Sequence, residues 1–187
     1  MTVFLMIVAI GLAIAMGMIL MPKDLDQIKG YPTELITTEE SANLLKEMQV
    51  ALDPKNTDAK VTLTEEQVNR YLNQRIAGDQ GGPLGALVKY RGVYADLEPG
   101  FVELYLVRSV AGLPFTVSCR LTQKKSGYAT VWRAGGGSIG RIRMGSKQFK
   151  PIIDAFLRLR VVCGDEMDAI KAMREVQFGD DQIVFAK

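Results

Sequence analysis

Residues 87–110, LVKYRGVYADLEPGFVELYLVRSV, decide the fold class of this chain. Apolar and polar side chains alternate on both sides of Glu98-Pro99-Gly100, which has the composition of a tight turn. Alternation with a period of two is typical of strands with one buried face, and strands joined by short turns pair antiparallel. We therefore expect a β-hairpin here.

The same alternation continues to about residue 144. Residues 111–114 predict a second turn and residues 124–127 a third, before a strand region over 128–144. Consecutive strands linked by turns predict an antiparallel meander. Gly135-Gly136-Gly137 interrupts the last strand region, and glycine inside a strand is typical of a bulge or a bend. We therefore expect this sheet to be strongly curved.

Two amphipathic helices are expected before the sheet. Thr37 and Glu40 have capping-box spacing ahead of a helix over about 38–52. A short strand over 60–63 leads to Thr64, which caps a second helix. Glu65 and Glu66 fall in the first turn of this helix, where carboxylates complement the helix dipole, so we assign them no acid–base chemistry.

Two further elements follow the sheet. Residues 149–162 form the most apolar segment of the remaining chain and predict a third helix, too short and too charged to cross a bilayer. Residues 176–185 predict a terminal hairpin. The expected fold class is α+β, with amphipathic helices packed on a strongly curved antiparallel sheet.

The first residues of the chain carry no charge and read MTVFLMIVAIGLAIAMGMILM over 1–21. As a helix this run is about 30 Å long, the thickness of the hydrocarbon core of a bilayer. We expect a transmembrane anchor over 1–22, a tether over 23–36 and a single α+β domain over 37–187. The alternative is a cleaved signal peptide, with Ala13-Ile14-Ala15 as the cleavage site.

The orientation of the span is not fixed by charge. Lys23 and Lys29 follow the apolar run and no basic residue precedes it, which favours a cytoplasmic domain. Asp24 and Asp26 lie among these lysines and the count is small. The charges therefore do not decide the side of the membrane.

Composition excludes several classes of chemistry. The 187 residues contain no histidine, which removes Ser-His-Asp and Cys-His catalysis and imidazole metal sites. Cys119 and Cys163 lack metal-site spacing, and they form either a disulfide or two buried small side chains. The formal net charge of +2 predicts no nucleic-acid partner. We expect no cofactor, no metal site and no enzymatic activity.

A local run of basic residues follows the glycines. Its members are either a solvated strand face or a surface for anionic lipid headgroups. The candidates for headgroup binding are Arg141, Arg143 and Lys147.

Residues 61–72, VTLTEEQVNRYL, resemble a strand-to-helix motif of the YpmS-type and YceB-type bacterial envelope proteins. The element Ser138-Ile-Gly-Arg-Ile142 and the order of later elements are also similar, over roughly residues 59–186. This family is similar to the tubular lipid-binding fold, in which a long helix packs into a highly curved sheet and lipid tails lie in the groove. The resemblance implies an extracytoplasmic domain on a single N-terminal anchor. The chain departs from the family at residues 144–147, where Met-Gly-Ser-Lys replaces a Pro-Leu-Pro type segment.

Two functions are therefore expected from different classes. The first is binding or handing over a lipid or amphiphile between the third helix and the sheet. The second is a non-enzymatic scaffold subunit of a membrane protein complex, with a membrane protein as partner. The expected lining of the lipid groove, for which ordinary core packing is the alternative, is Phe115, Val117, Phe149, Ile152, Ile153, Phe156 and Leu157.

Overall fold

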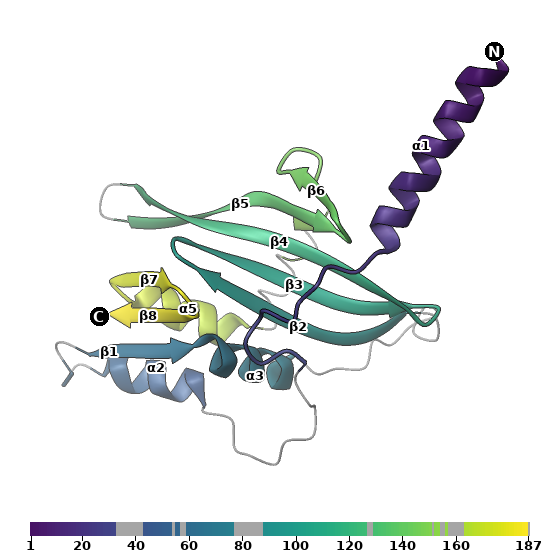
Figure 1. The fold of residues 1–187 in the computed structure, drawn as a ribbon. Coiled ribbons are helices and arrows are strands. Elements are labelled where there is room, and N and C mark those ends of the chain that lie inside the picture. Colours follow the sequence, from purple (N-terminus) through teal and green to yellow (C-terminus); the bar gives the residue numbers. More distant parts are fainter. Residues whose placement is uncertain are drawn as a thin grey trace.

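The computed structural model is an α+β protein with two antiparallel sheets and one N-terminal apolar helix (Figure 1). The α+β class and the antiparallel pairing predicted from the sequence are confirmed. The structure describes residues 1–32, 43–53, 55–56, 59–76, 88–126, 129–150, 152–153, 156 and 163–186.

Helix α1, Thr2–Leu20, extends away from the sheets (Figure 1). Its mean hydropathy is 2.8 and none of its residues is buried inside the protein. It is long and apolar enough to span a membrane, and a signal sequence at the N-terminus would meet the same criteria.

The larger sheet has five strands in the order β2-β3-β4-β5-β6, so every strand pairs with its neighbour in the sequence. The predicted meander is confirmed. The expected single strand region over 128–144 is in fact two strands, because the chain reverses at Gly140 and Arg141. The strands are β2, Val88–Glu98; β3, Phe101–Val110; β4, Leu113–Ser126; β5, Ala129–Ile139; and β6, Ile142–Gly145.

The expectation of a strongly curved sheet is wrong, because the sheets are open and are neither strongly curled nor closed. The glycines act locally. The β4–β5 register shifts between Arg120 and Leu121, opposite the glycines, and Gly136 has a φ of +114°. A Cβ on Gly137 would overlap the Ser118 carbonyl oxygen and lie 2.6 Å from the Phe149 ring. Gly135-Gly136-Gly137 therefore forms a bulge and admits a packed aromatic ring.

The smaller sheet has the order β1-β8-β7 and is formed by strands far apart in the sequence. The predicted terminal hairpin is confirmed as β7 and β8, and β1 adds to it antiparallel. Helices lie beside it (Figure 1). These elements are β1, Lys60–Thr64; β7, Glu175–Gly179; β8, Gln182–Ala186; α2, Leu44–Leu52; α3, Glu65–Arg75; and α5, Gly164–Ala172.

Side-chain caps fix where the helices begin. Thr64 and Gln67 form the predicted capping box, with Gln67 N donating to Thr64 Oγ1 at 3.2 Å and Thr64 N to Gln67 Oε1 at 2.9 Å. Helix α2 begins after Asn43, whose Oδ1 accepts from Lys46 N at 3.1 Å. The capping box predicted at Thr37 and Glu40 lies outside the described residues.

The main core lies between the two sheets. Leu63 of β1 and Phe185 of β8 are 2 % and 3 % exposed and belong to one cluster with Leu97 and Val102 of the larger sheet. On the same face of the larger sheet, Phe149 and Phe156 pack against Cys119. The described residues of the expected third helix therefore pack on the sheet as predicted.

Helix α3 closes one edge of the larger sheet with side-chain hydrogen bonds. Strand β2 is an edge strand, so alternate N–H and C=O groups have no partner strand. The Oδ1 atoms of Asn73 and Asn69 accept from the backbone N–H groups of Val93 at 2.9 Å and Ala95 at 2.6 Å. Their Nδ2 atoms donate back to the carbonyl oxygens of the same strand residues at 2.7 and 2.9 Å.

Glu65 is the third member of this ladder. Its Oε2 accepts from Leu97 N at 2.6 Å, and the residue is 1 % exposed. The expectation that Glu65 only complements the helix dipole is therefore wrong. Four helical residues rise about 6 Å and two strand residues about 6.8 Å. Because these repeats nearly match, every fourth residue of α3 meets every second residue of β2.

We predict that Asn69→Ala lowers the free energy of unfolding by roughly 2–4 kcal/mol, because the N–H and C=O of Ala95 lose a buried partner. The neighbouring variant Arg70→Ala removes an exposed ion pair with Glu66 and should cost about 0.5 kcal/mol or less. Urea unfolding followed by circular dichroism measures both. Equal losses for the two variants would contradict the ladder.

Candidate functional site

The carboxyl end of α1 is fixed to the turn between β5 and β6. The last carbonyl groups of a helix have no partner inside the helix. One of them, on Met18, accepts from Arg141 N at 3.0 Å, while Gly140 N donates to Thr116 O at 2.8 Å. Gly140 has a φ of +53°, and a Cβ there would lie 2.6 Å from Met18 O. Glycine therefore allows this backbone contact.

A cleft of about 370 Å³ opens at this junction. Three of its lining side chains are cationic and one is a carboxylate, so its charge is positive. Arg141 in the turn and Arg143 in β6 are exposed, and half-buried Lys23 lies in the segment that follows α1. The lining is Lys23, Asp24, Gln27, Ser138, Gly140, Arg141 and Arg143.

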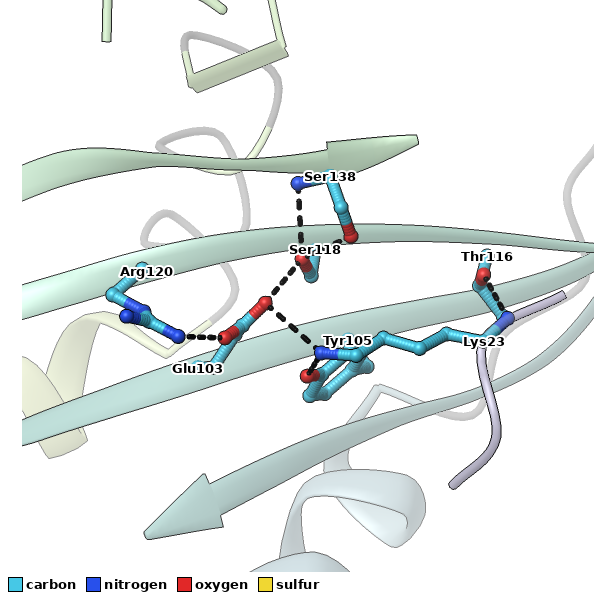
Figure 2. A network of polar contacts seen from close by, with 7 residues as sticks. All are labelled: Lys23, Glu103, Tyr105, Thr116, Ser118, Arg120 and Ser138. Atoms are coloured by element: carbon cyan, nitrogen blue, oxygen red, sulfur yellow. Dashed lines mark hydrogen bonds and ion pairs between the residues drawn. The ribbon is translucent and has the colours of Figure 1, made fainter. Parts of the chain in front are cut away.

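A buried polar network, shown in Figure 2, shares Lys23 and Ser138 with the lining of the cleft. Its centre is Glu103 on β3, 6 % exposed, which accepts from Ser118 Oγ at 2.7 Å and from the Arg120 guanidinium at 2.8 Å. Ser118 Oγ also lies 2.7 Å from Ser138 Oγ and accepts from Ser138 N at 3.1 Å. Because Ser138 lines the cleft, the network fixes part of the cleft lining.

Lys23 is the first charged residue after α1, and it joins the helix to this network (Figure 2). Its Nζ lies 3.5 Å from Glu103 Oε1 and donates to the Tyr105 hydroxyl. Its backbone N donates to Thr116 Oγ1 at 3.1 Å. The chain then continues across the sheet, where Leu25 and Ile28 are buried against Tyr105 and neighbouring side chains. The first part of the expected tether, residues 23–32, thus lies on the sheet.

The network keeps the Glu103 carboxylate ionised. Burial would raise its pKa, but hydrogen bonds from Ser118 and Arg120 and the charge of Lys23 lower it below the ordinary value of 4.5. Burial and the charge of Glu103 raise the pKa of Tyr105, so its hydroxyl remains protonated. The arrangement places a fixed negative charge next to Lys23, which lines the cleft.

The structure brings together two of the three predicted headgroup residues. Arg141 and Arg143 line the cleft, whereas Lys147 is exposed in the turn after β6. Sequence reasoning used Lys23 only to count charges and missed Glu103. A signal for Glu103 was present, because it is a lone carboxylate between apolar residues of a strand.

The predicted groove residues lie in packed surroundings where the structure describes them. Phe149 is fully buried and Phe156 is 9 % exposed, in contact with Val117, Ile152 and Ile153. Phe115 is half-buried on β4, and Leu157 lies outside the described residues. The described residues form at least four clefts, and none of these side chains lines those four.

Other chemistry finds little support in the part of the chain that the structure describes. Within those residues no group of three His, Cys, Asp or Glu side chains is placed to hold a metal ion. Cys119 and Cys163 are both free, so the disulfide alternative is not realised. Burial raises the pKa of the Cys119 thiol to about 11, which disfavours the reactive thiolate.

No protein-family model matches the chain, and no curated protein or solved structure matches it. The resemblance of residues 61–72 and 138–142 to the YpmS-type and YceB-type envelope proteins stays a prediction.

We predict that Glu103→Gln removes a pH-dependent part of the stability. A lowered pKa in the folded state means that the carboxylate stabilises the fold above about 4.5, and this stabilisation is lost as the pH falls through the folded-state pKa. Melting temperatures from pH 7 to pH 3 should therefore converge for the variant and the wild type at the acidic end. The exposed Glu66→Gln is the control and should follow the wild type throughout.

Proposed function

We propose that the protein is a membrane-anchored, non-enzymatic binding domain that holds the anionic headgroup of a lipid or amphiphile at the membrane surface. The observation that carries this proposal is the positive cleft at the carboxyl end of the apolar helix. Handing the amphiphile over to another protein is the wider role that we infer for an envelope domain of this kind.

The position of the cleft relative to the bilayer supports the proposal. Helix α1 is about 28 Å long, so an uncleaved α1 reaches from one side of the hydrocarbon core to the other. The hydrogen bond from Arg141 N to Met18 O places the cleft two residues from the end of this helix. The cleft then lies at the level of the lipid headgroups.

The chemistry of the lining also supports it. A guanidinium group binds phosphate through two parallel hydrogen bonds, and Arg141 and Arg143 both lie at the cleft. A cation near an anionic membrane surface contributes about 1 kcal/mol of attraction. Asp24 is the one carboxylate among the described lining residues, against three cations, so the described lining is net positive.

The acyl-chain part of the earlier expectation stays a prediction. In this prediction, a groove between the third helix and the sheet is lined by Phe115, Val117, Phe149, Ile152, Ile153, Phe156 and Leu157. Phe149 is fully buried with its ring close to Gly137, so the described part of this region supports core packing more than a groove. We therefore assign headgroup binding to the cleft and make no assignment for the tails.

The scaffold function is a second proposal, supported by a different observation. Strand β1 is an edge of the smaller sheet, and a cleft of about 520 Å³ lies between it and α2. Open strand edges accept added strands from partner chains. A membrane protein partner could therefore pair with β1.

We predict that Arg141→Gln/Arg143→Gln weakens binding of residues 22–187 to vesicles containing phosphatidylglycerol by tenfold or more, since the loss is about 1 kcal/mol per cation. Sedimentation with the vesicles measures the partition coefficient, and vesicles of phosphatidylcholine alone give the baseline. The matched control, Arg133→Gln/Arg174→Gln, removes the same charge from exposed positions outside the cleft.

Equal losses for the two double variants would show attraction to the whole surface and would contradict a specific site. No vesicle binding by the wild type, together with a stoichiometric partner cross-linked at β1, would favour the scaffold function instead.

A further inference from the structure

A second cleft, of about 450 Å³, lies against β2 and β3 and shares no lining residue with the cleft at α1. It is formed where residues 31–32 meet the strand ends and the turn between β3 and β4. Its volume is in the range of sites that hold small organic ligands. The side chains that the argument uses are Tyr31, Tyr90, Arg91, Tyr94 and Arg108.

Two of these side chains carry buried polar atoms without a partner. They are the hydroxyl of Tyr90 and the Nε of Arg108, and the two residues lie directly opposite each other in the β2–β3 register. Among the described side chains only one other buried polar atom, on Glu166, also lacks a partner. Native proteins satisfy nearly all buried polar groups, so two unpaired donors on facing residues that line one cleft favour an acceptor bound there.

The charge of the lining indicates the kind of acceptor. Arg91 and Arg108 line the cleft, and among the described lining residues there is no carboxylate. Burial raises the pKa of Tyr90 to about 12, so its hydroxyl keeps its proton and can donate to an acceptor at neutral pH. Both unpaired groups are therefore donors beside a surplus of positive charge, which favours an anion.

The walls indicate the rest of the ligand. Tyr31 and Tyr94 lie edge to face, with ring centroids 4.9 Å apart, and both line the cleft with Val107 and Pro114. Such a wall packs well against apolar or aromatic groups. A bare inorganic anion would use the two donors but none of this surface.

We propose that this cleft is a second binding site, which takes an anionic group carried on an apolar or aromatic body. Tyr90 and Arg108 donate to the anion, and the Tyr31 and Tyr94 rings contact the body. A phospholipid headgroup and a free aryl phosphate share this chemistry. The site is independent of the function proposed for the cleft at α1.

The test is isothermal titration calorimetry of the full chain in nanodiscs of phosphatidylcholine, with three probes. Phenyl phosphate and dihexanoyl phosphatidate carry the anion on a body, and inorganic phosphate does not. We expect Tyr90→Phe and Arg108→Gln each to weaken phenyl phosphate binding about tenfold, since each removes one donor to the anion. Arg174→Gln, an exposed arginine outside the cleft, is the charge-matched control and should bind as the wild type does.

A melting curve without probe separates binding from folding. Tyr90→Phe removes an unpaired buried hydroxyl, so the variant should melt at the same or a higher temperature while its affinity falls. Tighter binding of dihexanoyl phosphatidate than of phenyl phosphate would identify a lipid as the source, and the reverse a free small molecule. Inorganic phosphate binding as tightly as phenyl phosphate, no binding of either probe, or equal affinity in all variants would overturn the proposal. A loss of vesicle binding in the Arg141→Gln/Arg143→Gln variant would not change the result of this titration, because the two clefts share no described lining residue.

Discussion

The ladder of hydrogen bonds between α3 and the edge of β2 is the constraint on which the arrangement of this protein depends. A five-stranded open sheet has two edges with unpaired backbone groups. At the β2 edge the amides of Asn69 and Asn73 each provide one acceptor and one donor, as a neighbouring strand would. The helix thereby replaces a sixth strand, and leaving these groups unpaired inside the protein would cost more than any single apolar contact here gains.

The ladder also joins three parts of the chain. Helix α3 follows β1 directly, so its position on β2 fixes the smaller sheet relative to the larger one. Glu65 Oε1 accepts from Lys29 N at 2.7 Å, and Asn69 donates to Lys29 O at 2.8 Å. The segment that leads from α1 is thus held at Lys29 by the ladder and at Lys23 by the Glu103 network. These two attachments fix the segment after α1 on the sheet, and the carboxyl end of the apolar helix is thereby held beside it.

Local patterns were sufficient to predict much of the fold. The strands of the meander, the capping box at Thr64 and the terminal hairpin all depend on neighbouring residues, so a single sequence reveals them. The ladder was not predictable in this way, because Asn69 and Asn73 look like exposed polar residues until an edge strand is placed beside them. The glycines at 135–137 were interpreted as a bend of the whole sheet. A bulge and a tight ring contact need the same residue, and the sequence pattern does not distinguish them.

The candidate cleft shows the same division between local and distant information. Arg141 and Arg143 were found from a run of basic residues, whereas Lys23 meets Tyr105 across 82 positions of sequence. Lys23 and the two arginines have different roles. Glu103 and the Tyr105 hydroxyl hold Lys23, so its charge is largely balanced and it fixes the end of α1 to the sheet. Arg141 and Arg143 remain exposed, and the surplus positive charge of the cleft therefore comes from a turn whose backbone is already bound to the apolar helix. Exposed cations on a fixed backbone stay at one depth relative to the apolar helix, which suits the headgroup binding proposed for this cleft.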